Sequence, residues 1–367
     1  MNCHLSPCLR SRAVNFLPRA LTSWFGWLFA GGIGVMCLAG EASSSVPPTP
    51  EEGTALARAS LPKDTPPAPK GYHSQTELLF AYGLKQLKLI NTKPEVPPEV
   101  RETKDVEYGK VGERALLLDL YQPAKPSVPA PALVFIHGGA WSQGSRDIYK
   151  FYTVRYAQRG YVAATVGYRL SREAPFPAAV EDVKCAVRYL RANAAKYGID
   201  PARIAAVGGS AGGHLSMMLG YAGPEAGLEG KGGNEGVSSA VQAVVNFYGP
   251  FDLTTPFAQT NAAAIGFMGG KTYAQAPEMF AKASPCTYLK AGAPPTLTFH
   301  GTIDDIVPID QADRLAARLK QLGVPFVYDR LDGWPHTLEL AQNVNDHCDV
   351  VMSRFLQEYL PLTPRKP

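Results

Sequence analysis

The chain has 367 residues, of which 46% are hydrophobic and 19% are charged. This balance excludes a disordered or fibrous chain and provides ample apolar side chains for a core. The net charge is only +4 and no run of Lys or Arg forms a basic stripe, which excludes the electrostatic footprint of a nucleic-acid-binding protein.

The first 42 residues have the layout of an export leader. Residues 1–20 carry arginines and no acidic side chain, residues 21–39 are uncharged and mostly apolar, and small residues follow at positions 40 and 42. Residues 1–42 are therefore interpreted as a signal peptide, which predicts a secreted or periplasmic protein. Because residues 21–39 are also long enough to cross a bilayer, an uncleaved N-terminal membrane anchor is the alternative.

Residues 43–104 form a segment in which proline is frequent. Between residues 43 and 70 the prolines stand among Ser, Ala and Thr, a composition that buries too little apolar surface to order itself. We predict a solvated tether there, followed by one short helix over residues 76–90.

From about residue 105 to residue 361, short apolar runs alternate with helical patterns. Strands are predicted at 116–121, 132–136, 161–166, 203–207, 241–247, 296–299 and 326–331. Helices are predicted at 176–197, 212–221, 310–322 and 343–360. This alternation predicts one α/β domain with a mostly parallel sheet and helices on both faces. Ligands bind such sheets beyond the carboxyl ends of the strands, where every motif below lies.

A candidate nucleophile follows the strand predicted at 203–207. Gly208-Gly209-Ser210-Ala211-Gly212 matches G-x-S-x-G, with a strand before it and a helix after it, as the motif requires. Such a sharp turn holds the serine in a strained conformation, and the outer glycines let the strand and the helix approach. The helix N-terminus behind the hydroxyl favours negative charge. The pattern predicts Ser210 as a nucleophile.

A serine hydroxyl is a weak nucleophile and needs a base. His137 and His300 each end a buried strand before a glycine, and His214 follows the serine too closely, so these three are expected to be structural. His347 lies in the terminal helix and is expected to be solvated or to cap it. His4 lies in the leader and His73 near the tether, so His336, in the loop after the last predicted strand, is left as the base.

The base needs a carboxylate that orients it. Asp304 and Asp305 both lie beyond strand 296–299, and the order serine, acid, histidine is that of an α/β-hydrolase. Spacing does not choose between the two aspartates. Negative charge developing on a substrate carbonyl needs backbone N–H donors, which are predicted at Ala211 and in the glycine-containing loop 137–141.

Four motifs together resemble the esterases of the α/β-hydrolase fold, especially the hormone-sensitive-lipase-like and bacterial feruloyl/acetyl esterase-like group. They are His137-Gly-Gly-Ala-Trp141, Tyr168-Arg169-Leu170, Gly208-Gly-Ser-Ala-Gly-Gly213 and His300-Gly-Thr-Ile-Asp304 with Val307-Pro308. The resemblance covers residues 105 to 360. It implies a Ser210–Asp304–His336 triad, so that Asp304 is chosen over Asp305, and an oxyanion hole formed by Gly138, Gly139 and Ala211. The sequence HGGAW in place of HGGG points to the feruloyl/acetyl esterase or arylformamidase side of the family.

The expected substrate follows from the region above this site. Residues 251–290 carry many aromatic side chains and are expected to form a small lid, with Trp141 as a substrate-binding residue at the pocket mouth. We expect hydrolysis of carboxylic esters with short acyl or aryl acid groups, with acetyl or feruloyl esters of carbohydrate as candidates. The alternatives are an arylformamidase-like amide hydrolase and a serine peptidase of the prolyl-oligopeptidase type.

No metal or cofactor is expected, since no cysteine or histidine spacing suggests a metal site and the triad chemistry needs none. Cys185, Cys286 and Cys348 remain after the leader, so at most one disulfide can form. Cys185 lies within a helical apolar stripe and is expected to be a buried, inert thiol.

Overall fold

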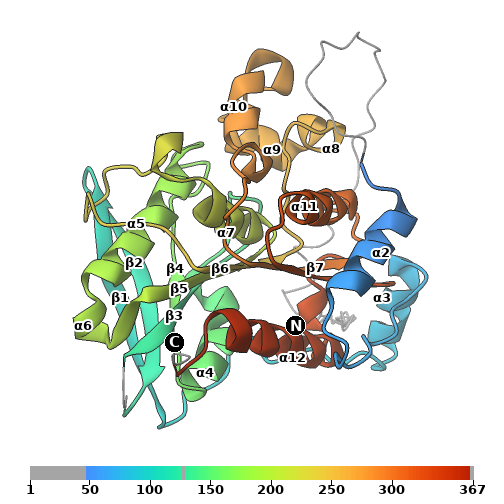
Figure 1. Cartoon of the computed structure of the whole chain (residues 1–367), viewed down its shortest axis with the longest axis horizontal. Coiled ribbons are helices and arrows are strands. Elements are labelled where there is room, and N and C mark those ends of the chain that lie inside the picture. The colour runs from blue at the N-terminus through green and yellow to red at the C-terminus, as the bar shows by residue number, and fades with distance from the viewer. Residues whose placement is uncertain (1–46, 126–128, 364–367) are drawn as a thin grey trace, which may run out of the picture. The chain divides into compact units, whose positions relative to one another are not determined.

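The structure, a computed structural model, describes residues 47–125 and 129–363. Its centre is an eight-stranded sheet in the order β1-β2-β4-β3-β5-β6-β7-β8 (Figure 1). The pairs β1–β2 and β2–β4 are antiparallel, and all the other neighbours are parallel. The strands are β1 (Val100–Val111), β2 (Arg114–Pro123), β3 (Ala130–Ile136), β4 (Val162–Val166), β5 (Ile199–Gly209), β6 (Ala243–Phe247), β7 (Thr296–Gly301) and β8 (Phe326–Leu331).

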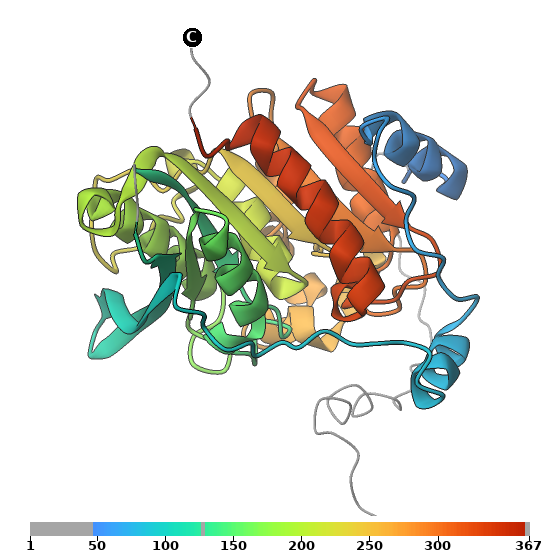
Figure 2. The same cartoon turned by 90° about the horizontal axis from the view of Figure 1, so that it is seen from below.

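Helices cover both faces of the sheet, because alternate side chains of each central strand point to opposite sides. Along β3, Val134 and Ile136 join the core under one set of helices, whereas Leu133 and Phe135 join the core under the other. The first face carries α5 (Ala178–Ala192), α7 (Ala211–Tyr221) and α11 (Asp310–Gln321), and the second carries α4 (Lys150–Gln158) and α12 (Gln342–Tyr359) (Figures 1 and 2). The predicted α/β architecture is confirmed.

The prediction of a solvated tether over residues 43–70 is wrong for its central part. Residues Pro50–Ser60 form helix α2, which begins with a capping box between Thr49 and Glu52 and has Pro50 at its first position. Leu56 packs against α11 and against Tyr328 of β8, which is an edge strand. The apolar contacts that order α2 are supplied by residues far along the chain, and α2 in turn covers the edge.

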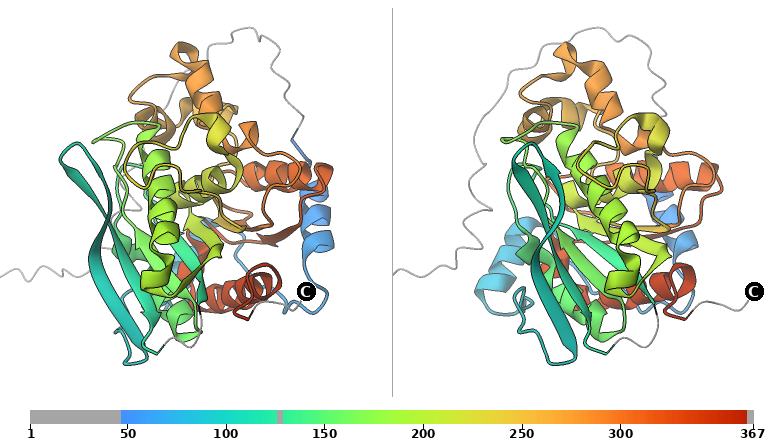
Figure 3. Two further views of the ribbon diagram at one scale, coloured as in Figure 1. Left: turned by 60° about the vertical axis from the view of Figure 1, so that its left-hand side comes forward. Right: turned by 90° about the vertical axis from the view of Figure 1, so that its left-hand side faces the viewer.

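The remaining elements differ from prediction mainly at their ends. The helix predicted over 76–90 is α3 (Gln75–Gly83), and the sheet begins before residue 105 because β1 pairs with β2. The helix predicted over 176–197 is divided into α5 and the short α6 (Ala194–Tyr197). The expected lid region contains α8 (Pro256–Thr260), α9 (Ala262–Phe267) and α10 (Pro277–Lys282), which lie together on one side of the sheet (Figure 3).

The predicted leader, residues 1–42, lies outside the described residues. Within residues 47–125 and 129–363, none of the helices combines the length and the apolar character needed to cross a bilayer.

Candidate active site

Ser210 stands in the turn between β5 and α7 with a φ of +56°, a backbone conformation that is strained for a residue with a side chain. A Cβ placed on Gly208 would lie 2.3 Å from the carbonyl oxygen of Gly212, and one on Gly212 would lie 1.9 Å from that of Ile136. Both separations are far inside van der Waals contact. The steric reason predicted for the outer glycines is therefore confirmed.

The backbone holds Ser210 and leaves its hydroxyl unused by the helix. The Ser210 N–H donates to the carbonyl oxygen of Phe247 at the end of β6, at 2.8 Å. Although Ser210 is the N-cap of α7, its side chain makes no capping hydrogen bond. The N-terminus of α7 lies directly behind this hydroxyl. The positive end of the helix dipole favours negative charge on the serine oxygen.

Asp304 and His336 lie together beyond β7 and β8, with Asp304 Oδ2 2.7 Å from Nδ1 of His336. The other carboxylate oxygen accepts hydrogen bonds from the backbone N–H groups of Ile306 and Val307, both at 2.9 Å. The neighbouring Asp305 is exposed. Of the two aspartates that spacing could not separate, the structure pairs Asp304 with the histidine.

Charge and hydrogen bonding keep the Asp304 carboxyl ionised despite its burial. Burial opposes ionisation, but the His336 imidazole and the nearby His300, whose Nε2 lies 3.3 Å from Oδ2, outweigh it and hold the pKa of Asp304 well below its ordinary value. A permanently ionised carboxylate is what a histidine base needs on its Nδ1 side, because it fixes the tautomer that leaves Nε2 to accept a proton.

The histidines expected to be structural make backbone hydrogen bonds. His137 Nδ1 lies 2.7 Å from the carbonyl oxygen of Gly138. His300 Nε2 lies 2.8 Å from the carbonyl oxygen of Val307, in the loop that follows β7. His214 is fully buried between Trp141 Nε1 and the carbonyl oxygen of Ala283, at 3.2 Å and 2.7 Å. Burial lowers the pKa of both His137 and His214 to about 4, so both are neutral at physiological pH.

The expectation that His347 is solvated is wrong. Its exposed fraction is 7%, and its Nε2 lies 2.7 Å from Asp329 Oδ2 on β8. Because α12 lies across the sheet, the face of the helix that carries His347 points inward. A buried carboxylate partners Nε2 of the imidazole, whereas Nδ1 is buried without a hydrogen-bond partner among the described residues.

The loop after β3 offers backbone donors beside the serine. A Cβ on Gly138 would lie 3.3 Å from the Cβ of Ser210, so the loop passes directly against the turn that carries Ser210. Gly139 has a φ of +109°. Its carbonyl oxygen accepts hydrogen bonds from the N–H groups of Ser142 and Gln143, which close the loop into a turn. Within the described residues, the N–H groups of Gly138 and Gly139 have no backbone acceptor.

Ala211 supplies a further N–H of the same kind. It is the first residue of α7, and the first N–H groups of a helix have no acceptor within the helix. The three backbone groups predicted for an oxyanion hole therefore lie in the two segments that meet at Ser210.

Trp141 does not lie at an open pocket mouth. Its exposed fraction is 5%, and its ring stacks on Phe267 of α9 with centroids 4.6 Å apart, while its N–H donates to His214. The tryptophan thus joins the loop after β3 to α9. The apolar ring led to the prediction of a substrate contact, but in the structure the ring packs against α9.

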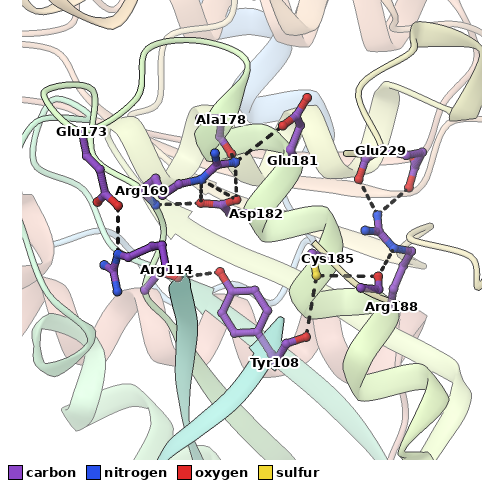
Figure 4. Close-up of polar contacts among 12 residues, drawn as sticks. Tyr108, Arg114, Arg169, Glu173, Ala178, Glu181, Asp182, Cys185, Arg188 and Glu229 are labelled. Atoms are coloured by element: carbon purple, nitrogen blue, oxygen red, sulfur yellow. Dashed lines mark hydrogen bonds and ion pairs between the residues drawn. The ribbon is translucent and has the colours of Figure 1, made fainter. Parts of the chain in front are cut away.

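A network of charged residues holds the segment that follows β4 (Figure 4). Arg169 donates to both carboxylate oxygens of Asp182 on α5, with its Nη2 2.7 Å from Oδ1. This fixes the adjacent Tyr168, whose ring stacks on His137 at 4.4 Å and whose hydroxyl donates to the His137 carbonyl oxygen. The Tyr-Arg-Leu motif therefore holds the start of the loop after β3 through His137.

The same region contains Cys185, which is fully buried under β1. Burial raises the pKa of its thiol, as expected for an inert cysteine. Cys185, Cys286 and Cys348 are all free thiols. Among the described residues, no group of three or more His, Cys, Asp or Glu side chains could hold a metal ion.

Two residues beside His336 were missed from sequence, Tyr248 and Glu339. The Tyr248 ring lies 4.4 Å from the His336 ring, its hydroxyl donates to the buried carboxyl of Glu339, and its φ is +42°. A Cβ on Gly209 would lie 3.0 Å from the Tyr248 hydroxyl, so this tyrosine connects the nucleophile turn with the histidine loop. Its place at the end of β6 is a signal that could have identified it.

Comparisons with known proteins agree with this geometry. The model of the BD-FAE family matches residues 118–319. Esterase LipC of Mycobacterium tuberculosis is 35% identical over 242 residues, which cover 64% of this chain and 59% of the relative. The chain spans about 60% of the length of the first curated relatives that it matches.

Solved structures give the same result. The native structure of Thermogutta terrifontis esterase Est2 superposes with a TM-score of 0.62 at 28% identity and covers 76% of this chain and 98% of its own. That esterase has also been solved with propionate and with butyrate bound. A truncated carbohydrate esterase from gut microbiota has a TM-score of 0.62 at 27% identity, covering 71% of this chain and 99% of its own. The fold is that of an α/β-hydrolase.

Proposed function

The chain belongs to the BD-FAE family, and from this premise we propose that it is a serine hydrolase that cleaves carboxylic esters through an acyl-enzyme. The observation that carries the proposal is the 2.7 Å contact of the buried Asp304 carboxylate with His336, at the sheet edge where Ser210 stands in its strained turn. Esterases among both the relatives and the solved structures support the same activity.

In the proposed mechanism, Nε2 of His336 takes the hydroxyl proton of Ser210 as the serine oxygen bonds to the ester carbonyl carbon. The carbonyl oxygen becomes an oxyanion. When the tetrahedral intermediate collapses, the bond to the alcohol breaks and the alcohol leaves with the proton from His336. Water then gives its proton to His336 and attacks the acyl-serine, which releases the acid and restores the serine.

Backbone N–H groups stabilise the oxyanion. We assign this role to Gly138, Gly139 and Ala211, whose N–H groups lie in the two segments that meet at the serine. Each such donor lowers the barrier by roughly 3 kcal/mol, because it is already oriented when the charge develops.

The substrates that we propose are esters with short acyl or aryl acid groups, including acetyl or feruloyl esters of carbohydrate. The binding of propionate and butyrate by Est2 and the carbohydrate esterase among the structural neighbours support this class. Three short helices rather than a large domain follow β6, which also favours a small acyl group.

The mechanism is tested by replacing the nucleophile. Ser210→Ala should abolish hydrolysis of p-nitrophenyl acetate, whereas Ser145→Ala, at an exposed serine that caps no helix by its side chain, should retain wild-type kcat. Paraoxon should phosphorylate Ser210, as mass spectrometry of the peptide would show. Wild-type activity in Ser210→Ala would refute the proposal.

A panel of acetyl, butyryl and feruloyl esters and a formyl amide defines the substrate class. Faster turnover of the formyl amide than of every ester would favour the arylformamidase-like alternative. The peptidase alternative has less support, because residues 47–98 fold as two helices and connecting segments rather than as strands of a propeller.

We further propose that residues 1–42 export the protein as a signal peptide, or that residues 21–39 retain it as a membrane anchor. The charge and hydropathy pattern of these residues supports both. N-terminal sequencing of the native protein after cell fractionation distinguishes them: a new N-terminus near residue 43 in a soluble fraction indicates cleavage, and an intact leader in the membrane fraction indicates an anchor.

A further inference from the structure

Residues 69–90, here called the arm, run along residues 332–341, the loop between β8 and α12 that carries His336 and is called the histidine loop. At the upstream side of this loop, the Tyr72 N–H donates to the carbonyl oxygen of Gly333 at 2.8 Å. Trp334 Nε1 donates to the carbonyl oxygen of Pro69 at 2.9 Å, and the Tyr72 ring meets the Trp334 ring edge-on with centroids 5.5 Å apart. The arm thus binds the two residues that lead to Pro335 and His336.

The arm also binds the downstream side of the loop. The Ile90 N–H donates to the carbonyl oxygen of Leu340 at 3.0 Å, and the Gln342 N–H donates to that of Lys88 at 2.8 Å. These bonds surround an antiparallel bridge between Leu89 and Ala341. In Figure 2, the segment that leaves the cyan α3 accordingly passes the end of the red α12 at which Gln342 begins the helix. His336 therefore lies between two attachment points of the same arm.

The arm and the loop that carries His336 approach each other closely at Gly71 and Gly333. A Cβ on Gly71 would lie 2.2 Å from the carbonyl oxygen of Asp332, and a Cβ on Gly333 would lie 2.5 Å from Tyr72 N. The arm also reaches the acid loop, where Gln75 Nε2 lies 3.4 Å from the carbonyl oxygen of Ile303, next to Asp304. Both partners of the acid–base pair are thus on segments that the arm contacts.

We propose that the arm is a positioning element of the hydrolase, and that Tyr72 and Trp334 hold the His336 loop at the distance and angle that proton transfer from Ser210 requires. The inference rests on the proposed function. Unlike the sheet, this loop has no ladder of strand partners, and Gly333 and Thr337 have positive φ values of +71° and +57°. A displacement of about 1 Å in such a loop can cost about 100-fold in rate.

The arm lies outside the part of the chain that the family model matches, residues 118–319. The loop that carries His336, residues 332–341, lies outside that part as well, so the family match covers neither side of these contacts. A merely stabilising arm would lower the melting temperature when it is loosened, but it would leave kcat unchanged in the folded enzyme.

The test is a pair of glycine substitutions in the full chain. Gly71→Ala forces the arm away from Asp332, whereas a Cβ on Gly83, at the end of α3, would meet nothing within 4 Å, so Gly83→Ala is the matched control. We expect Gly71→Ala to lower kcat on p-nitrophenyl acetate by about 10- to 100-fold with KM nearly unchanged. Gly83→Ala should keep the wild-type kcat.

Hydrogen–deuterium exchange of the peptide spanning residues 333–342 provides a second readout that needs no substrate. Exchange should rise in Gly71→Ala and not in Gly83→Ala. Equal exchange in the two variants would overturn the inference, whether or not any ester is hydrolysed. If the wild type hydrolyses no ester, the proposed function is refuted separately. Raised exchange with wild-type kcat on an ester that is hydrolysed would also overturn it.

If Gly71→Ala does not fold, Tyr72 gives the same test. Tyr72→Ala removes the ring that packs on Trp334 and should lower kcat, while Tyr72→Phe keeps the ring and should restore it. Loss of kcat in both variants, or in neither, would show that the ring contact does not position the loop.

Discussion

Asp304 Oδ2 lies 2.7 Å from His336 Nδ1, and the Asp304 side chain has no exposure to solvent. Two backbone N–H groups hold the second oxygen, so the carboxylate has one orientation available toward the imidazole. The carboxylate is therefore fixed before substrate binds, and in the proposed mechanism it stabilises the imidazolium without reorganisation.

We predict that Asp304→Asn lowers kcat by about 10⁴-fold, because an amide in this position donates to Nδ1 and stabilises the wrong tautomer. Asp305→Asn is the control, since its side chain is exposed, whereas Asp304 makes the 2.7 Å contact with His336. Steady-state kinetics on p-nitrophenyl acetate measure both. Similar losses in the two variants would contradict the assignment of Asp304 as the acid.

The buried His214 predicts a loss of stability in acid. Its pKa is lowered by burial from 6.5 to about 4, so between these values the unfolded chain binds a proton that the folded chain does not. Stability therefore falls as the pH drops through this window, by up to about 3 kcal/mol for this one group. In His214→Gln, which keeps a donor and an acceptor, urea unfolding at pH 6.5 and 4.5 should show a smaller decrease.

The remaining decrease in that variant should come partly from His137, whose pKa is lowered to the same value. Identical pH slopes for His214→Gln and the wild type would show that His214 is already protonated, or accessible to solvent, in the folded state.

Glu339 predicts a pH effect of the opposite sign. Burial raises its pKa more than the hydrogen bond from Tyr248 lowers it, so above the ordinary pKa the folded chain retains a proton that the unfolded chain has lost. The contribution of Glu339 to stability therefore becomes less favourable as the pH rises from 4.5. We expect Glu339→Gln to gain stability relative to the wild type between pH 5 and pH 8 in denaturant titrations.

A constant difference across this pH range would indicate that Glu339 is ionised in the folded enzyme. The measurement should be accompanied by kcat, because the Tyr248 ring lies against His336 and a shift of that tyrosine would appear as lost activity.

The turn at Ser210 predicts a steric penalty for Gly212→Ala, whose Cβ would lie 1.9 Å from the carbonyl oxygen of Ile136. We expect a loss near the upper end of about 1–3 kcal/mol, since backbone rather than a flexible side chain must move. Gly266→Ala in α9, where a Cβ meets nothing within 4 Å, should be neutral or gain up to about 1 kcal/mol. Thermal unfolding compares the two, and equal melting temperatures would contradict the close approach of strand and helix.

The sheet could be predicted because buried parallel strands read as continuous apolar runs, as β3 does. The turn that carries Ser210 could be predicted because Gly208 and Gly212 are a local steric requirement. By contrast, α2 was missed because proline-rich composition outweighed its local capping signal. Its ordering depends on contacts of Leu56 with α11 and β8, which no local pattern shows.

Side-chain environments were harder to predict than elements. His347 and Trp141 lie where expected along the chain, but their burial depends on the direction in which a helix or loop meets its neighbours. Glu339 was missed for the same reason, since only the assembled sheet brings it against the hydroxyl of Tyr248. Tyr248 itself stands at a strand end, which is a signal in the sequence, but its contact with His336 depends on the same assembly.

The position of α2 against β8 has a consequence for how the protein must be produced. Ser60 Oγ lies 2.8 Å from the Tyr328 N–H on this edge strand, and Leu56 packs on the same tyrosine ring. A fragment that begins at residue 105, where the alternating pattern of strands and helices begins, would lack α2. The unpaired backbone groups of β8 would then be exposed and could pair with a second molecule, which leads to aggregation. A fragment made for production should therefore retain α2 together with its N-cap residue Thr49.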